Sequence, residues 1–120
     1  MTAMNQVQLI GKITLEPRYK TFKSGAKLAE LGIGIPESKK KENGDWESTM
    51  HFVDVVLWSE QAEYAQANLK RGDGVMVLGS LQYESWEKEG KKQSKVRVKG
   101  KRVQFIDWPS REKTEKALSA

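Results

Sequence analysis

Apolar residues alternate with polar residues or glycine along five stretches of this 120-residue sequence, which is the pattern of half-buried β-strands. The stretches cover residues 7–14, 27–35, 50–58, 75–86 and 96–105. Strands with a period of two must bury one face against a shared core. The alternation therefore predicts a mainly β fold.

One segment between the third and fourth predicted strands has a different period. Within residues 59–72, the apolar positions that recur at helical spacing are Ala62, Ala65 and Leu69. Ser59 is predicted to cap the amides of the first turn, and the basic pair and glycine at residues 70–72 suit the end of a helix. We expect this helix to be the only one in the main body of the chain.

Glycines inside the predicted strands indicate how the sheet closes. Gly32 and Gly34 lie in the second strand, Gly79 in the fourth and Gly100 in the fifth. Glycine inside a strand commonly marks a bend or a bulge, as the strands of a small barrel need. Together with the order of the elements, these bends predict an all-β OB-fold, a five-stranded Greek-key barrel with one helix between strands three and four.

The remaining segments are expected to be loops and a tail. Residues 16–25 are predicted to be a connecting loop, and residues 37–46 a charged, mobile hairpin arm around Asn43 and Gly44. Residues 87–93 are predicted to form a charged turn. We expect the barrel to occupy residues 1–107, with residues 108–120 as a short tail.

The third predicted strand carries aromatic rings at both ends of one face. Alternation places Phe52, Asp54, Val56 and Trp58 on that face, and Trp86 ends the following strand. Flat rings on an exposed face predict a partner with flat apolar surfaces, and nucleic-acid bases are such a partner. The alternative is that these rings pack inside the barrel. For Trp46, in the charged arm, the sequence favours neither exposure nor packing.

Charge is concentrated in one segment of the chain. The sequence has a formal net charge of +5, and residues 84–102 hold eight basic residues against three acidic ones. This excess favours contact with a phosphate backbone, although a solvated strand face accounts for the charge run equally well. Charge alone therefore predicts only that the partner is a polyanion.

Several classes of function are disfavoured by composition. The absence of cysteine excludes disulfides, thiolate metal sites and a thiol nucleophile. One histidine and scattered carboxylates offer no spacing typical of catalysis or metal binding, so we expect neither an enzyme nor a cofactor. No stretch approaches a membrane span or a signal peptide, so we expect a cytoplasmic, nucleoid-associated protein with no membrane partner.

The order of motifs resembles that of the bacterial single-stranded DNA-binding proteins. Residues 5–11, Asn-Gln-Val-Gln-Leu-Ile-Gly, resemble the family's opening Asn-Lys-Val-Ile-Leu-Ile-Gly, and residues 52–58 resemble its Trp-His-Arg-Val-Val-Leu-Phe. Residues 69–73, Leu-Lys-Arg-Gly-Asp, resemble its Leu-Lys-Lys-Gly-Ser. The match covers roughly residues 5–105 in one register. It implies an OB-fold homotetramer that protects single-stranded DNA during replication, recombination and repair.

The resemblance assigns roles to individual positions. It places Phe52 and Trp58 at the two stacking positions of strand three, Trp86 at the stacking tryptophan after strand four, and Lys70 and Arg71 at a basic pair. The full set of expected nucleic-acid contacts is Phe52, Trp58, Trp86, Trp46, Lys39, Lys40, Lys41, Lys70, Arg71, Lys88, Lys91, Lys92, Lys95 and Arg97.

The sequence departs from the family's pattern in the groove and at the end of the chain. Asp54 stands where the family has arginine, and Gln82 and Glu84 stand where it has two more. We therefore expect greater reliance on the basic residues of the arms. Residues 108–120 lack the family's acidic and apolar tip, so partner recruitment by that route is not expected.

Two further expectations concern partners. The apolar face of the first strand, with Val7, Leu9 and Ile13, needs cover, which pairing into at least a dimer would give. The alternative function is a primosome or recombination accessory protein that keeps the OB-fold but acts mainly through replication and repair proteins.

Overall fold

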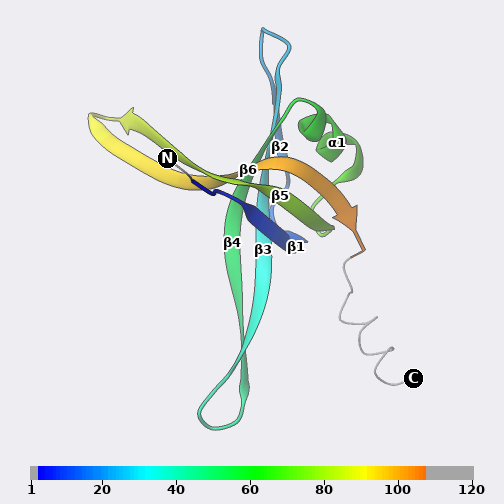
Figure 1. Ribbon diagram of the computed structural model, residues 1–120, viewed down its shortest axis with the longest axis vertical. Coiled ribbons are helices and arrows are strands. Elements are labelled where there is room, and N and C mark those ends of the chain that lie inside the picture. The colour runs from blue at the N-terminus through cyan, green and yellow to red at the C-terminus, as the bar shows by residue number, and fades with distance from the viewer. Residues whose placement is uncertain (1–2, 108–120) are drawn as a thin grey trace.

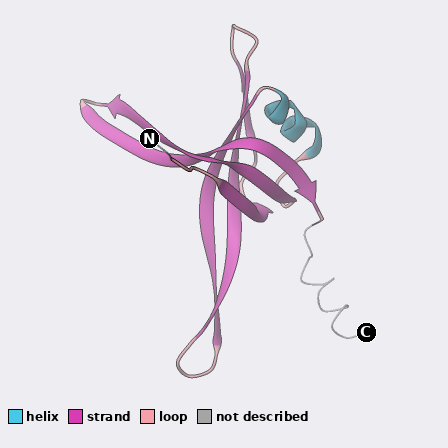
Figure 2. Cartoon of the chain, in the orientation of Figure 1, coloured by secondary structure: helices cyan, strands magenta, loops and turns pink. Residues whose placement is uncertain are grey.

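The structure is a computed structural model that describes residues 3–107 (Figure 1). Its elements are the strands β1 (Val7–Ile13), β2 (Arg18–Thr21), β3 (Lys27–Lys40), β4 (Trp46–Trp58), β5 (Gly74–Lys88) and β6 (Lys91–Ile106), and the helix α1 (Glu60–Asn68) between β4 and β5. Strands dominate the described chain (Figure 2). The predictions for the tail, residues 108–120, lie outside the described residues.

Five strands close into a barrel. Neighbouring strands follow the order β1-β5-β6-β4-β3-β2, and an additional pairing of β1 with β3 joins the two ends of the five-stranded set. The β4–β6 pairing is parallel, with Val55 opposite Val98. The predicted OB-fold with its helix between the third and fourth barrel strands is therefore confirmed. The short β2, which pairs along the outer edge of β3, was wrongly predicted as part of a loop.

The core lies between the inward faces of the barrel strands and the helix. On β4 the odd-numbered Val55 and Leu57 are fully buried, as the alternation predicts. Ala62 and Ala65 of α1 pack in the same cluster, so the small residues at helical spacing face the barrel. The other strands contribute Ile13, Ala29, Leu31, Ile33, Val75, Val77, Val98 and Val103 to this cluster.

Two long hairpins extend beyond the barrel as arms (Figure 1). The β3–β4 arm pairs as far as Lys40 opposite Trp46, so the hairpin arm predicted over residues 37–46 is present, and its strands continue beyond the predicted ranges 27–35 and 50–58. Backbone pairing extends a hairpin without any apolar alternation, which explains why the sequence pattern ended these strands early. Only the end is a turn, where Gly44 has a φ of 91°.

The β5–β6 arm ends in a tighter turn than predicted. Lys88 pairs with Lys91, which leaves only Glu89 and Gly90 between the strands. Both have positive φ values, 52° and 76°, as a two-residue type I′ turn requires.

The bend predicted at Gly79 lies where this arm leaves the barrel. Leu78 pairs with Arg102 but Gly79 pairs with Gly100, so β6 has one extra residue at this point. A Cβ atom on Gly79 would lie 2.2 Å from the backbone oxygen of Lys99. Only glycine allows the two strands to approach this closely, and the bulge bends the sheet.

The helix is shorter than predicted, and the predicted cap is wrong. Ser59 has a φ of 53° and makes no side-chain capping hydrogen bond. Its backbone N–H instead donates to the Lys27 oxygen, because the chain reverses directly from β4 into α1. Residues 70–72 lie beyond the helix in a turn, where the Gly72 N–H donates to the Ile13 oxygen.

Candidate nucleic-acid interface

The outward face of β4 carries three aromatic rings. Trp46, Phe52 and Trp58 occupy even-numbered positions, opposite in direction to the buried Val55 and Leu57, and are 68%, 72% and 39% exposed. The alternative that Phe52 and Trp58 pack inside the barrel is therefore wrong. Trp46, for which the sequence favoured neither outcome, is exposed.

The neighbouring strand explains why Phe52 is so accessible. Its cross-strand partner is Gly34, which has no side chain to cover the ring. A Cβ atom on Gly34 would lie 2.7 Å from Cγ2 of Thr14 and 2.9 Å from the sulfur of Met50. The glycine is thus required by close packing, and it leaves one face of the phenyl ring open.

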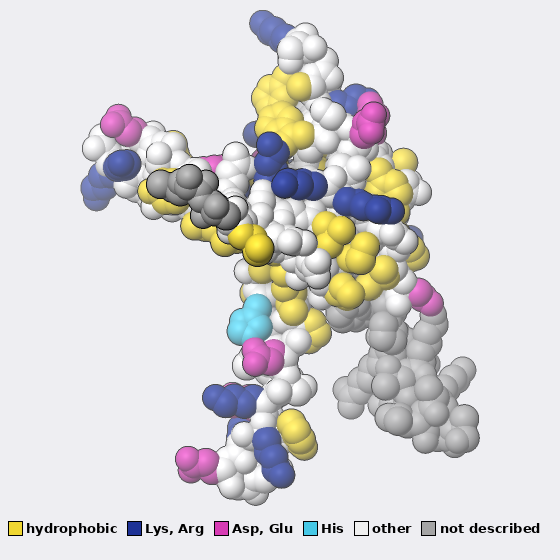
Figure 3. All heavy atoms as spheres, in the orientation of Figure 1, with side chains coloured by type: hydrophobic (Ala, Val, Ile, Leu, Met, Phe, Trp, Pro, Cys, Tyr) yellow, Lys and Arg dark blue, Asp and Glu magenta, His cyan; other side chains and the backbone are white. Residues whose placement is uncertain are grey.

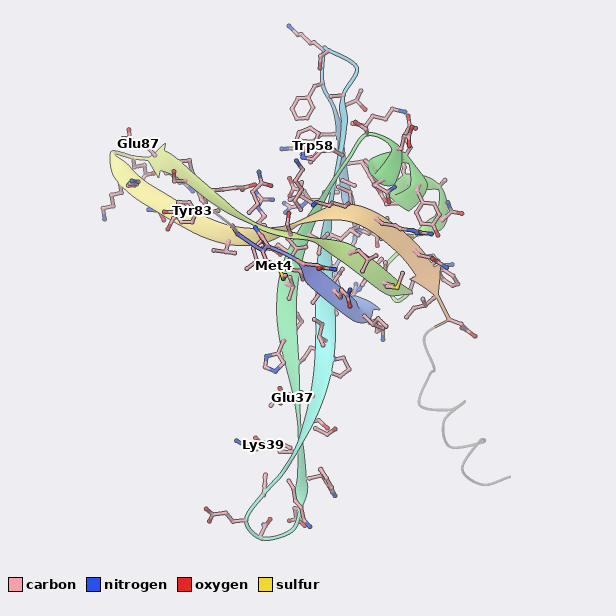
Figure 4. All side chains as sticks on the ribbon, in the orientation of Figure 1. Met4, Glu37, Lys39, Trp58, Tyr83 and Glu87 are labelled. Carbon is pink, nitrogen blue, oxygen red and sulfur yellow. The ribbon has the colours of Figure 1, made fainter. Side chains whose placement is uncertain are left out.

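Trp58 has an aromatic neighbour at its end of β4. The ring of Phe22, which follows β2, stacks on it with centroids 5.8 Å apart and planes inclined by 24°. Phe22 is 43% exposed and lies at the turn of the β2–β3 hairpin, so it forms a shared aromatic surface with Trp58, whose position Figure 4 shows. Phe22 was not among the predicted site residues because it lies in a predicted loop; its position between two lysines, at residues 20 and 23, was the available signal.

Trp86 lies on the β5–β6 arm and faces the same side as the β4 rings. It pairs with Gln93, and the next pair on that face is Glu84 with Lys95. The ammonium group of Lys95 contacts the carboxylate of Asp54, which shares the outward face of β4. Trp86 is 43% exposed, whereas Tyr83 lies on the opposite face of the same arm and is 65% exposed (Figure 4).

The ends of both arms carry exposed lysines with acidic side chains among them (Figure 3). Lys39, Lys40 and Lys41 are exposed around the turn of the β3–β4 arm, with Lys40 opposite Trp46. At the end of the β5–β6 arm the exposed lysines are Lys88, Lys91 and Lys92. Within residues 3–107, none of these six lysines has an ion-pair partner. They are available for contact with phosphate.

The turn after α1 brings a basic side chain close to a ring on β4. Arg71 and Phe52 line the same open hollow of about 540 Å³, together with Lys12 and Met50. Lys70 is exposed beside it, and its backbone N–H donates to Oδ2 of Asp73 at 3.0 Å. The structure thus combines a predicted stacking residue with a predicted phosphate contact, although the two are distant in sequence.

The groove between β4 and β6 is different because its cations are already paired. Arg97 lies 2.9 Å from Oε2 of Glu84 and 3.9 Å from Oε2 of Glu30, and Arg18 also contacts Glu30 at 3.0 Å. Lys95 pairs with Asp54. All of these side chains except Glu84 line a hollow of about 370 Å³. The expected phosphate contacts Lys95 and Arg97 are therefore engaged with carboxylates of the same chain.

Other titratable groups do not add a chemical site. Burial raises the pKa of Tyr19, and the nearby carboxylate of Glu16 raises it further, so this phenol stays neutral at neutral pH. Tyr19 packs against the core cluster rather than facing the groove. Among the described residues, no group of three or more histidine or carboxylate side chains could hold a metal ion. Residues 3–107 also include no helix long and apolar enough to cross a membrane.

Known proteins that match this chain share one description. The model of the single-strand binding protein family matches residues 4–106. A single-stranded DNA-binding protein of Aquifex aeolicus is 36% identical over 106 residues, which are 88% of this chain and 72% of the relative. A protein of the same description from Treponema pallidum is 33% identical, over 88% of this chain and 60% of that relative.

Solved structures agree with the fold. The wild-type single-stranded DNA-binding protein of Thermus aquaticus is 30% identical, with a TM-score of 0.74 over 87% of this chain and 50% of that chain. A Plasmodium falciparum SSB in complex with ssDNA is 20% identical, with a TM-score of 0.80 over 89% of this chain and 98% of that chain. At that identity the second likeness establishes the fold alone. The chain spans only about half of the Thermus structure.

Proposed function

The chain belongs to the single-strand binding protein family, and on this premise we propose that it binds single-stranded DNA without sequence preference. Bases stack on Phe52, Trp58 and Trp86, while lysines of the arms and Arg71 hold the phosphates. The observation that carries the proposal is that all three rings are exposed, from 39% to 72%, on one side of the sheet. The protein acts by binding, without catalysis or a cofactor, and protects unpaired strands in replication, recombination and repair.

The spacing of the rings supports a mechanism in which one strand contacts several of them. Phe52 and Trp58 are six positions apart on β4, which at about 3.3 Å per residue separates them by about 20 Å. They must therefore hold different nucleotides of the strand. Each stacked base contributes about 1–3 kcal/mol, and every base has a flat face, so such binding tolerates any sequence.

Titration of the intrinsic tryptophan fluorescence tests the proposal. The protein would be titrated with oligo-dT, oligo-rU and a DNA duplex at 50 mM and 500 mM NaCl. We expect saturable quenching by oligo-dT that persists at the higher salt, because stacking does not depend on salt, and little quenching by the duplex. Binding that gives no quenching, or that disappears for every ligand at 500 mM NaCl, would show a polyanion binder instead.

The cover that we expected a dimer to give Val7, Leu9 and Ile13 comes instead from the barrel core, which contains Ile13 and packs against Val7 and Leu9. The open edge of β1 supports assembly into at least a dimer, with a homotetramer as in the family. β1 pairs with β5 over its length but with β3 only at Lys12 and Ile13. Beside the remaining edge, Ile10 is 56% exposed and lines an apolar hollow with Met76 and Leu78. Sedimentation velocity of native protein and of Ile10→Lys tests this. A monomeric native protein would contradict the proposal.

A second candidate function is that of a primosome or recombination accessory protein. It is favoured by the second face of the β5–β6 arm, where Leu81, Tyr83 and Val96 are 53%, 65% and 56% exposed. An apolar face of this kind suits a protein partner. Retention of replication or repair proteins on the immobilised chain after nuclease treatment, combined with weak oligo-dT binding, would favour this function over the first.

A further inference from the structure

We propose that Asp54 and Glu84 compete with DNA phosphates for Lys95 and Arg97. In the free protein these cations of the groove are paired with the two carboxylates, and a bound strand must break the ion pairs. The inference rests on the proposed function. It assigns a specific role to these two carboxylates, which is to limit the affinity for single-stranded DNA and to make that affinity less dependent on salt concentration.

Asp54 lies on the path of a strand that contacts both rings of β4. It lies between Phe52 and Trp58 on the outward face of β4, so a strand that stacks on both rings must pass over it. Its side chain is 42% exposed, and that of its partner Lys95 is 47% exposed. Both groups are therefore accessible to a phosphate, and the pair is not locked by burial.

A second ion pair lies in the same groove as that of Asp54 and Lys95. Arg97 and Glu84, on adjacent strands of the β5–β6 arm, are 24% and 29% exposed and lie 2.9 Å apart. Nε of Arg97 is buried without a hydrogen-bond partner. The carboxylate thus satisfies only part of the guanidinium, which has a planar set of donors suited to a phosphate.

The charges within the groove are balanced, because three cations face three carboxylates. Arg18, Glu30, Arg97 and Glu84 form one connected set of ion pairs, and Lys95 and Asp54 form a separate pair beside it. A phosphate that takes Lys95 from Asp54 leaves a carboxylate that recruits a cation from solution. The uptake of that cation offsets part of the counterion release on which salt-dependent affinity rests.

The test compares native protein with Asp54→Asn and with Glu84→Gln in oligo-dT titrations from 50 to 500 mM NaCl. We expect each variant to bind several-fold more tightly at the lowest salt. Each should also steepen the plot of log affinity against log salt by about 0.7, the value for one additional phosphate contact on a single strand. Asp54→Glu keeps the charge and should behave as native protein does.

A matched control is Glu63→Gln on α1. Glu63 pairs with Lys27 at 3.0 Å, so this variant makes the same change in net charge and also breaks an ion pair, but outside the groove. We expect its affinity to stay within about twofold of native, with an unchanged salt slope. Thermal unfolding of all variants would detect damage to the fold, and Glu84→Gln provides an independent test if Asp54→Asn is unstable.

The outcomes separate the two proposals. If native protein binds oligo-dT but neither neutral variant gains affinity or slope, or if Glu63→Gln gains as much as they do, the inference is wrong while the proposed function stands. If native protein fails to bind oligo-dT at every salt concentration, both are wrong. Tighter binding and a steeper slope confined to Asp54→Asn and Glu84→Gln would support the inference.

Discussion

The two hairpin arms have similar lengths but present their functional groups differently. On the β3–β4 arm the rings of Trp46 and Phe52 are 68% and 72% exposed, and the lysines lie at the end of the arm. On the outward face of the β5–β6 arm the ring of Trp86 lies beside paired acids and bases, whereas the lysines at the end of that arm lack ion-pair partners among the described residues. The cations near the rings therefore differ between the two regions. Lys40 and Arg71, near the β4 rings, have no ion-pair partner among the described residues, whereas Lys95 and Arg97, on the β5–β6 arm, are paired. We infer that rings on β4 determine binding and that charge at the ends of the arms modulates it.

Removal of the β4 rings should have the largest effect. For Phe52→Ala combined with Trp58→Ala we expect a loss of about 2–6 kcal/mol in binding to oligo-dT, because each stacked base contributes about 1–3 kcal/mol. Fluorescence anisotropy of a labelled oligonucleotide measures this. Tyr83→Ala is the matched control, since it removes an exposed ring from the other face of the β5–β6 arm and should bind as native protein does. Equal losses in the two proteins would remove the distinction between the faces.

The direction of the aromatic side chains on β4 was predictable because alternation with a period of two needs only a correct strand, but the burial of Val56 on that same face was not. Buried Val55 and Leu57 place Phe52 and Trp58 on the other side, whatever surrounds them. The ion pair between Lys95 and Asp54 was not predictable in the same way. Its partners are far apart in sequence and meet through the pairing of β4 with β6, and no local pattern encodes that register.

The errors in the fold also have physical causes. β2 has only four residues, and Tyr19 alone among them packs against the core, so no alternation was visible. Ser59 is a residue type that caps helices well, but the abrupt reversal from β4 fixes it at a φ of 53° and leaves its side chain without a capping hydrogen bond. Tertiary constraints overrode local preference in both places.

A backbone change at the base of the β5–β6 arm tests whether that arm depends on its bulge. Gly79→Ala would place a Cβ atom 2.2 Å from the Lys99 oxygen, and backbone cannot move aside as a flexible side chain can. We expect a decrease of about 1–3 kcal/mol in the free energy of unfolding, measured by urea denaturation, as overpacked sites show. Ser80→Ala at the next position is the control. A stability equal to that of native protein would mean that the arm tolerates a different register.

Removal of charge at the ends of the arms should have the smallest effect. For the triple variant Lys88→Gln, Lys91→Gln and Lys92→Gln we expect about a tenfold loss of affinity at 50 mM NaCl and little loss at 500 mM. The salt slope should fall by up to about 2, since each lost phosphate contact removes about 0.7. The equivalent triple variant of Lys39, Lys40 and Lys41 tests the other arm. A loss that persists at high salt would assign these lysines more than a charge contribution.

The most direct test of the central claim isolates the ring of Trp58. Replacing Trp46, Trp86 and Trp108 by phenylalanine leaves one tryptophan of the four in the sequence, on the face of β4 that we assign to base stacking. The fluorescence of this protein is then followed during titration with oligo-dT at 500 mM NaCl, while anisotropy of the labelled oligonucleotide reports binding independently. We predict quenching of Trp58 that saturates together with the anisotropy signal. Binding by anisotropy with unchanged Trp58 fluorescence would contradict the claim that this ring stacks on bases.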